Sequence, residues 1–515
     1  MKRTALITAI TLFLALANTY AQELIELKKP GSDIITWKYM FYNGSVTDPQ
    51  GKEGLDALTA DLIIEGGTKQ YTKTQIDSIL YPMSAVYYAS IDKEVTVFTF
   101  QVHKDFADRF YQIASGLLFH PAFNPDDFSR VKDNQQVYVD QVIKSSSDEE
   151  YSKMALEDFL FKGTAYQHMV TGTSSGVKSI ELKDVIDHYG SRYTRDNVLV
   201  GITGDYSDAF RDKIMADVKQ LPSLTEKMPE IRQAKMPAGI NVEIVQKDNT
   251  LGSAIYFGFP INITRADDEF AALMVANSWL GEHRKSYSDL YQKIRSDRSM
   301  NYGDYSYIEW YEQGGRNMLP PPHVQRHANY FSVWIRPVQT AASLKSQYPE
   351  LKNITIGHAH FAIRMALHEI DKLIKNGMSQ EDFELTRQFL MSYIKLYVQT
   401  PERELAYLMD SRFYGRKDYI NEMETLLSNV TLDQVNAAIR KYLQIRNMDI
   451  TIVTDKSEAG PLAESLKSGK PSPMSYSNTV KEGLPKSILD EDKEVEAFPM
   501  KVNSVKIIDS ADTFK

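Results

Sequence analysis

The stretch Leu182-Lys-Asp-Val-Ile-Asp-His-Tyr-Gly-Ser-Arg-Tyr193 leads through Thr-Arg-Asp-Asn197 into the apolar run Val198-Leu-Val-Gly-Ile-Thr-Gly-Asp205. The same pattern recurs near the end of the chain. Five residues recur 250 positions later and the tyrosine recurs 249 positions later. The matching pairs are Leu182/Leu432, Val185/Val435, Tyr193/Tyr442, Asn197/Asn447, Ile202/Ile452 and Asp205/Asp455. Both copies predict a helix that ends at Tyr, a short turn that carries Asn, and a strand that ends at Asp. Such a recurrence indicates an internal duplication.

Two further matches follow the same order along the chain. The corresponding residues are Phe128/Phe383 at an offset of 255, and Leu58/Leu273 and Gly66/Gly281 at an offset of 215. Asn124 and Ser379 lie just before the first of these matches, where each is expected to cap the start of a helix. The change in offset predicts about 40 extra residues in the second copy. We place this insertion at about 311–352, as a surface excursion around Pro320-Pro-Pro322, because three prolines in a row cannot join a helix or a central strand.

Each copy has the same expected order of elements. The predicted strands lie at 34–43, 94–102 and 253–260, and the predicted helices at 55–64 and 267–280. The fold class is therefore α+β, with two homologous domains, each a mainly antiparallel sheet covered by helices on one face. The expected divisions are a signal peptide (1–21), a first domain (22–221), a linker (222–238), a second domain (239–456) and a C-terminal tail (457–515). The tail is rich in Ser, Pro, Lys and Glu, so we expect it to be extended except for a strand at 502–508 that joins a sheet edge.

The composition excludes several kinds of site. The 515 residues include no cysteine, which rules out disulfides, cysteine nucleophiles and thiolate metal sites. The net charge of −9 argues against a nucleic-acid-binding surface. Neither a phosphate-loop nor a dinucleotide glycine fingerprint occurs.

The first residues are typical of a secretory signal peptide. Lys2 and Arg3 precede an apolar core from Leu6 to Leu16, and small residues lead to an expected cleavage after Ala21. No later stretch is apolar over about 18 residues, so we expect no membrane span. The predicted location of the mature chain is a bacterial periplasm.

Several local motifs resemble the pitrilysin/insulinase family of zinc metallopeptidases, in particular the branch that includes mitochondrial processing peptidase and two-chain bacterial peptidases. The resemblance covers about residues 30–455. It rests on Gly-Ser-Val-Thr-Asp-Pro-Gln-Gly-Lys-Glu-Gly-Leu (44–55), Glu-Gly-Gly-Thr (65–68), Pro-Ala-Phe (121–123), Gly-Ile-Thr-Gly-Asp (201–205), Trp-Leu-Gly (279–281) and Leu-Tyr-Gln-Lys-Ile-Arg (290–295). The resemblance implies that the two domains form half of a clamshell chamber.

The zinc-binding residues of that family are missing here. Catalytic members carry H-x-x-E-H on the helix after the Gly-Leu, with two His ligands and a Glu general base. The corresponding positions are Ala57, Ala60 and Asp61, which cannot supply this set. Asp133 and Asp140 show the spacing of the family's acidic pair, but two carboxylates without histidines suit Zn²⁺ poorly. We therefore expect this chain to bind no metal.

Two groups of histidines are candidates for a replacement metal site. His368 and Glu369 resemble the start of a zincin motif, but Lys372 stands where the second His is needed, and His358 and His360 are expected to be packing residues. His323 and His327 lie four positions apart inside the Pro-rich stretch, where helical geometry is not assured.

Arg295 and Tyr302 match an Arg/Tyr pair that family members place on the second domain. The resemblance implies that such a pair reaches a zinc site and binds the scissile carbonyl or the substrate backbone, and that two-chain relatives supply it in trans. The leading hypothesis is therefore a non-catalytic subunit of a two-chain periplasmic zinc metalloendopeptidase. Its partner would bear H-x-x-E-H and hold the zinc, and extended peptides would bind to a sheet edge.

Other interpretations remain open. Arg-x6-Tyr is a loose pattern, and the 294–302 segment could simply anchor a strand to a helix. The chain could also be an inactive peptide-binding or scaffold protein of the same fold. A third possibility is an autonomous enzyme with a site at His323 and His327.

Overall fold

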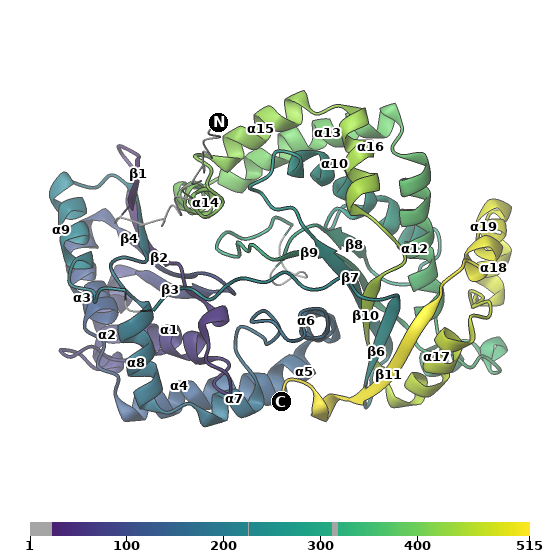
Figure 1. The fold of residues 1–515 in the computed structure, drawn as a ribbon, viewed down its shortest axis with the longest axis horizontal. Coiled ribbons are helices and arrows are strands. Elements are labelled where there is room, and N and C mark those ends of the chain that lie inside the picture. Colours follow the sequence, from purple (N-terminus) through teal and green to yellow (C-terminus); the bar gives the residue numbers. More distant parts are fainter. Residues whose placement is uncertain (1–22, 225, 312–317) are drawn as a thin grey trace, which may run out of the picture.

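The computed structural model describes residues 23–224, 226–311 and 318–515, so the predicted signal peptide (1–21) lies outside the described residues. Two sheets form the framework, one in the first half of the chain (23–221) and one in the second half (239–515) (Figure 1). The first sheet has the order β1 (Glu23–Lys28), β5 (Val198–Gly204), β2 (Ile34–Phe41), β4 (Thr96–His103), β3 (Val86–Ile91). The second has the order β11 (Val502–Asp509), β6 (Ile240–Lys247), β10 (Met448–Asp455), β7 (Gly252–Ile261), β9 (Asn329–Gln339), β8 (Asp304–Tyr307).

The two sheets share one topology. In the first, β1 is parallel to β5, and the pairs β5–β2, β2–β4 and β4–β3 are antiparallel. In the second, β6 is parallel to β10, and the pairs β10–β7, β7–β9 and β9–β8 are antiparallel. The predicted α+β class with two mainly antiparallel sheets is therefore confirmed, and the common strand order agrees with the repeat seen in the sequence.

Helices account for most of the remaining chain. The first half contains α1 (Leu55–Glu65), α2 (Lys73–Leu80), α3 (Ala107–Phe119), α4 (Pro125–Val137), α5 (Ile143–Ser146), α6 (Asp148–Leu160), α7 (Ser174–Ser179), α8 (Leu182–Arg192) and α9 (Asp208–Val218). The second half contains α10 (Phe270–Gly281), α11 (Ala341–Gln347), α12 (Ala359–Asn376), α13 (Gln380–Tyr393), α14 (Pro401–Phe413), α15 (Tyr419–Asn429), α16 (Leu432–Tyr442), α17 (Lys456–Ser468), α18 (Asn478–Gly483) and α19 (Lys486–Glu496). In the part of the chain that the structure describes, no helix is both long and apolar enough to cross a membrane.

The repeated sequence stretch forms α8–β5 in one half and α16–β10 in the other. All seven residues of β5 are buried, because this strand has a neighbour on each side and is covered on both faces. Thr431 caps α16 through a capping box with Gln434, and the side chains of Asn124 and Ser379 cap α4 and α13 as expected.

The segment 311–352 is not a single surface excursion. It contains β9, an internal strand of the second sheet, and the stretch just before β9 is buried, with 3% of His323 and 4% of Arg326 exposed. The additional residues of the second half lie on both sides of β9. The connection from β8 to β9 spans 308–328, whereas its counterpart from β3 to β4 spans only 92–95. The prolines are half-buried and belong to a stretch, 318–328, that contacts the first half.

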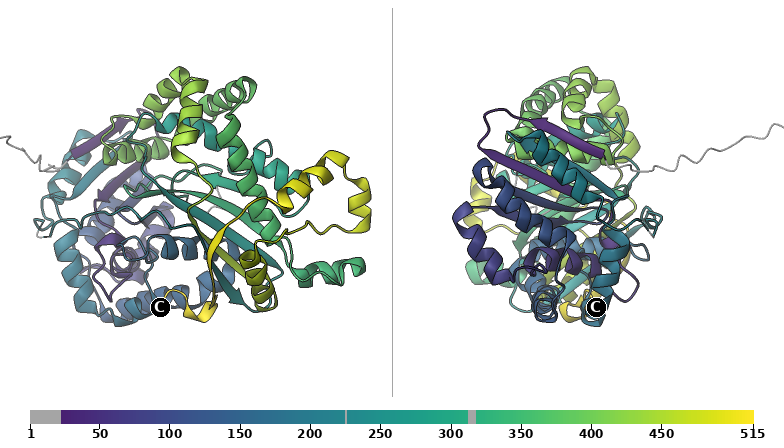
Figure 2. Two further views of the ribbon diagram at one scale, coloured as in Figure 1. Left: turned by 45° about the vertical axis from the view of Figure 1, so that its right-hand side comes forward. Right: turned by 90° about the vertical axis from the view of Figure 1, so that its left-hand side faces the viewer.

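The tail is mostly helical, so the prediction of an extended segment was wrong over α17, α18 and α19. Ala459, Leu462, Ala463 and Leu466 follow a helical spacing and join the core of the second half, although Pro461 lies inside α17. The strand predicted at 502–508 is confirmed: β11 pairs in parallel with the outer side of β6 (Figure 2).

The two halves exchange helices. Each half covers one face of its sheet with its own helices, and the opposite face receives a helix from the other half (Figure 1). Leu405 and Met409 of α14 pack with Met40 and Leu199 of the first sheet. On the second sheet, α6 packs against β7 and β10, where its Leu156 lies in one cluster with Tyr256 and Trp334 of the sheet. Burial of each such side chain contributes about 1.5–3 kcal/mol, so the exchange holds the halves in a fixed relation.

Gly201 tests this arrangement, because it is the point where β5 approaches α14. A Cβ atom at Gly201 would lie 2.6 Å from Sδ of Met409 and 3.1 Å from Leu405. We expect Gly201→Val to lower the free energy of unfolding by about 2–3 kcal/mol in urea titrations, because the added side chain overpacks this contact. Gly190→Ala is the control, since its Cβ meets nothing within 4 Å. A Gly201→Val protein as stable as wild type would contradict the close packing, whereas partial rescue by Met409→Ala would support it.

Candidate functional site

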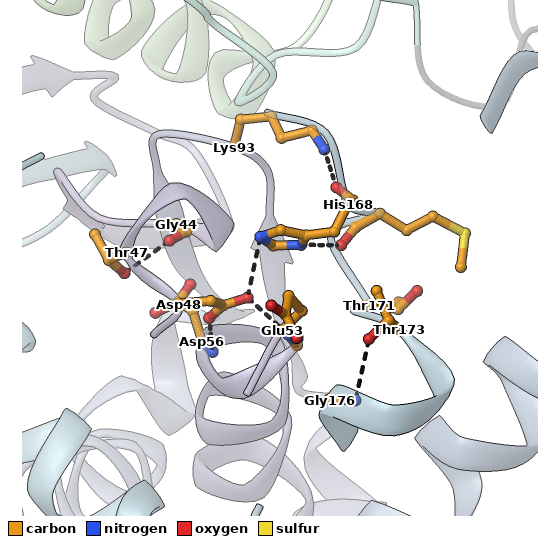
Figure 3. Close-up of polar contacts among 12 residues, drawn as sticks. Gly44, Thr47, Asp48, Glu53, Asp56, Lys93, His168, Thr171, Thr173 and Gly176 are labelled. Atoms are coloured by element: carbon orange, nitrogen blue, oxygen red, sulfur yellow. Dashed lines mark hydrogen bonds and ion pairs between the residues drawn. The ribbon is translucent and has the colours of Figure 1, made fainter. Parts of the chain in front are cut away.

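The loop 44–54 sets the start of α1, the helix at the positions of the lost zinc motif. The buried Asp48 carboxylate accepts hydrogen bonds of 2.7 Å from the backbone N–H groups of Gly54 and Asp56 (Figure 3). Gly54, which precedes α1, has a φ of +102°, a conformation that favours glycine. Burial and the neighbouring Asp56 carboxylate raise the pKa of Asp48 well above its usual value. Asp48 therefore caps the N-terminus of α1, because Gly54 has no side chain to accept a hydrogen bond there.

The two ends of the loop 44–54, at Gly44 and Gly54, are packed without space for additional atoms. A Cβ on Gly44 would lie 2.3 Å from the carbonyl oxygen of Asp92, and one on Gly172 would lie 2.0 Å from that of Glu53. Figure 3 shows the 168–176 segment beside this loop, with His168 directed towards Asp48. The motif at 44–55 that carries the family resemblance thus has a structural role, independent of the metal ligands that follow it.

The positions of the lost zinc motif face a cavity of about 410 Å³, here called the α1 cavity. Ala57 and Asp61 line it from α1, and Tyr138 lines it from the π-helical turn that follows α4. Ala60 lies beneath, fully buried in the core of the first half. Trp310 and the stretch 322–324 of the second half close the opposite wall.

A zinc ion does not fit the residues at these positions. Ala57 and Ala60 offer no donor atom, and Asp61 is a single carboxylate. Asp133 and Asp140 are both exposed, and Asp140 accepts a hydrogen bond of 2.8 Å from Gln136. Within the described residues, no three His, Asp or Glu side chains form a group that could hold a metal ion.

Asp56, next to the first of these positions, belongs to the core of the first half. Its carboxylate accepts or shares hydrogen bonds with four side chains: Asn43 at 2.7 Å, Thr96 at 2.7 Å, Tyr193 at 2.9 Å and His188 at 3.0 Å. Burial favours the neutral acid, but the hydrogen bonds, with that from His188 the strongest influence, hold the pKa of Asp56 below its usual value. The carboxylate is therefore satisfied internally and has a structural role.

The candidate histidines do not come together. His358 and His360 bond to the carbonyl oxygen of Ser475 and the hydroxyl of Ser465, at 2.9 and 2.8 Å. His368 shares its Nδ1 with Glu369 at 2.7 Å. His323 lies 3.2 Å from Nζ of Lys38, whereas His327 pairs with Glu94 at 2.6 Å. Each histidine thus has its own partner, and His323 is buried between the two halves, not at the surface.

A buried charge network beside the α1 cavity was not predicted from the sequence. The turn Asp92-Lys93-Glu94 between β3 and β4 has all three side chains buried. Arg326 of the second half donates two hydrogen bonds to the Asp92 carboxylate, at 2.6 and 2.7 Å, and a third to Glu157. Its guanidinium also lies 4.1 Å from the ring centre of Trp310. This Asp92 network holds the stretch 318–328 against the first half, beside the α1 cavity.

Arg295 and Tyr302 lie together, but not at the α1 cavity. The Arg295 guanidinium lies between the rings of Tyr291 and Tyr302, 4.8 and 5.4 Å from their centres, and its Nη1 donates to the Tyr302 carbonyl oxygen at 3.0 Å. Tyr302 is 74% exposed. Both residues line a separate open concavity of about 650 Å³ in the second half, here called the arginine concavity.

A duplicated α+β chain that keeps the zinc-helix scaffold without its ligands is a metallopeptidase-like protein that lacks the metal site. Comparison with known families agrees. Residues 27–174 match the family described as insulinase (peptidase family M16), and residues 179–390 match the peptidase M16 inactive domain. The chain therefore belongs to the insulinase, or M16, family, as the sequence motifs predicted.

Two curated relatives come from Bacillus subtilis. Over 231 residues the chain is 23% identical to "Uncharacterized zinc protease YmxG", a match that covers 44% of this chain and 53% of that protein. Over 201 residues it is 24% identical to "Probable inactive metalloprotease YmfF", covering 38% and 46%. The chain spans about half the length of the curated relatives it matches.

Solved structures show the same fold. A peptidase M16 inactive domain from Pseudomonas fluorescens aligns with a TM-score of 0.70 at 17% identity, covering 85% of this chain and 97% of that one. A chain from the structure of Complex III2 from Candida albicans aligns with a TM-score of 0.63 at 13% identity, covering 84% and 93%. At these identities the likeness concerns the fold alone.

The Asp92 network gives a stability prediction. Arg326→Met keeps much of the side-chain volume but removes the guanidinium that bonds the buried carboxylates of Asp92 and Glu157, of which Glu157 keeps its ion pair with Lys93 at 3.5 Å. We expect it to cost about 3–5 kcal/mol in urea unfolding. The control is Lys183→Met, which breaks a helix-surface pair with Asp187 whose side chains are 78% and 62% exposed, and which should change stability by less than about 0.5 kcal/mol. Equal stability of the two variants would show that the network does not hold the halves together.

Asp61 gives a pH prediction. Burial, with the nearby carboxylates of Glu65 and Asp56, raises its pKa to about 6. The folded chain thus keeps a proton that the unfolded chain releases near pH 4, so this residue makes stability fall as the pH rises from about 4 to 6. Asp61→Asn removes that loss. We expect the variant to be more stable than wild type by about 1–2 kcal/mol at pH 7.5 and equal to it at pH 4, measured by urea unfolding. The same difference at both pH values would refute the assignment.

Proposed function

We propose that this chain is the non-catalytic subunit of a two-chain periplasmic zinc metallopeptidase. Its partner would be a homologous chain that bears H-x-x-E-H, and Arg295 and Tyr302 would act at the partner's site. The observation that carries the proposal is the separation of two features. The zinc-ligand positions are lost and lie at a cavity lined in part by the second half, whereas the Arg295–Tyr302 pair is preassembled in an open concavity.

The geometry of the pair supports a role in binding a peptide at its reacting bond. Stacking between two tyrosine rings holds the Arg295 guanidinium in place, so fewer side-chain rotations are lost when a ligand binds. The exposed Tyr302 hydroxyl and the free N–H groups of Arg295 can donate hydrogen bonds to a carbonyl oxygen and to the negative charge that develops on it. When bound in the partner, zinc would supply the activated water for hydrolysis.

The first sheet offers a place for an extended peptide. β3 is an outer strand that pairs with β4 and with no other described strand, and Val86 and Tyr88 are 45% and 40% exposed. A peptide added at this edge would gain main-chain hydrogen bonds independent of its sequence. A peptide paired with the outer strand β3 would then be held within the chamber that this chain forms with its partner.

One observation favours a second candidate function, a peptide-binding or scaffold protein without hydrolysis in any complex. Trp310 and the stretch 322–324 line the α1 cavity with residues of the chain's own second half. The family fold also occurs in a chain of Complex III2, an assembly of several proteins.

Peptide hydrolysis distinguishes these functions. The mature chain would be assayed alone, with a coexpressed H-x-x-E-H homologue from the same genome, and as Arg295→Ala or Tyr302→Phe in that pair. We expect no activity alone, activity in the pair, and a loss of about 10²–10³ in kcat for a variant that removes a donor to the oxyanion. Arg232→Ala is the matched control, since this arginine is 74% exposed and lies in the 222–238 segment.

Two results would contradict the proposal. Equal rates for the pair with wild-type and Arg295→Ala chains would favour the scaffold function. Recovery of the tagged chain in the cytoplasmic fraction after osmotic shock would exclude the periplasmic location.

A further inference from the structure

We propose that the arginine concavity binds carboxylate groups, so that the peptides it selects are acidic ones. Three arginines from separate elements meet there: Arg284 follows α10, Arg295 lies in the π-helical turn 291–296, and Arg336 lies on β9. Tyr291, Tyr302 and Tyr305 form its walls. This inference rests on the proposed function, because it names the substrate class of the same site. It adds Arg284 and Arg336 to the Arg/Tyr pair.

The concavity carries uncompensated positive charge. Arg336 pairs with Glu149 of α6, with 2.9 Å between Nε and Oε1. Neither Arg284 nor Arg295 has a carboxylate of the described residues within ion-pair distance. Asp304, on the adjacent strand, has a fully buried side chain that accepts a hydrogen bond of 2.6 Å from Asn301, and burial raises its pKa well above the usual value. Two guanidinium charges therefore face solvent in a chain whose net charge is −9.

The arginines are also held in position for a ligand. Within the described residues, the hydrogen bonds of Arg295 engage only its Nη1, which leaves Nε and Nη2 as parallel donors. Arg336 lies over the ring of Trp334, 5.6 Å from its centre. Arg284 is exposed and has a φ of +56°, a left-handed conformation that is uncommon for a non-glycine residue and that occurs at binding sites.

A carboxylate is the ligand that this arrangement fits. A guanidinium fork and a planar carboxylate form two parallel hydrogen bonds, which are stronger than bonds between neutral groups. The concavity is open and walled by tyrosines, so a peptide backbone can lie across it while a Glu or Asp side chain reaches an arginine. Uncharged peptides would gain only the aromatic contacts.

Fluorescence anisotropy of the mature chain alone tests this inference without a partner. The probes are dansyl-Gly-Ser-Glu-Glu-Ser-Gly-amide and a twin with Gln-Gln in place of Glu-Glu, at about 50 mM salt. We expect the acidic peptide to bind at least about tenfold more tightly, since hydrogen bonds to a charged group contribute about 1.5–3 kcal/mol. Arg284→Gln and Arg295→Gln should each remove most of this preference, Arg284→Lys should restore part of it, and Arg232→Gln should leave it intact.

Several outcomes would overturn the inference. These are equal binding of the two peptides, an unchanged preference in Arg284→Gln, and complete competition by 10 mM inorganic phosphate, which would indicate a general anion site. Circular dichroism of each variant separates a lost fold from a lost contact. Because the assay needs no hydrolysis, its failure leaves the proposed peptidase subunit standing. An inactive pair would likewise leave acidic-peptide binding intact.

Discussion

The structure depends on one constraint: both faces of each sheet are apolar, and both must be covered by helices. A sheet with apolar side chains on both faces cannot remain half exposed, and each half of this chain covers only one face of its own sheet with its own helices. The exchange of α6 and α14 meets that need for both halves at once. As a consequence, the halves have no independent folded form with all apolar surface buried. The α1 cavity, the Asp92 network and the outer strand β3 all take their positions from this exchange.

The family scaffold is retained although the catalytic residues are lost, because the two have different physical roles. Asp48, Gly44 and Gly54 of the 44–54 loop are constrained by close backbone contacts, and a side chain at either glycine would disturb them. Ala57 and Ala60, in contrast, face a cavity or the core, where loss of a metal ligand removes a polar group from a buried place and costs little stability. The helix therefore remains when its chemistry is lost.

Local patterns account for what the sequence could predict. The repeated stretch that forms α8–β5 and α16–β10 has strong apolar periodicity, and the zinc-motif positions follow from adjacent residues. The Asp92 network could not be predicted, because Arg326 lies 234 positions from its partner and a single arginine usually indicates a surface residue. Asp133 and Asp140 have the expected spacing, yet the phase of α4 and of the following π-helical turn directs Tyr138, and not these carboxylates, to the cavity. The sequence did not predict α17, because Pro461 interrupts the apolar periodicity of that helix.

The Asp92 network also bears on the evolutionary history of the chain. Restoring H-x-x-E-H takes substitutions at three helix positions on a scaffold that is already in place, and a third zinc ligand would have to be added elsewhere. The wall formed by the second half would still stand, however, because Arg326 and its two carboxylates are each costly to remove alone. Any single step towards reopening the cavity thus passes through a less stable protein. Selection can therefore improve this chain as a partner of another protein more readily than it can restore independent catalysis to the chain.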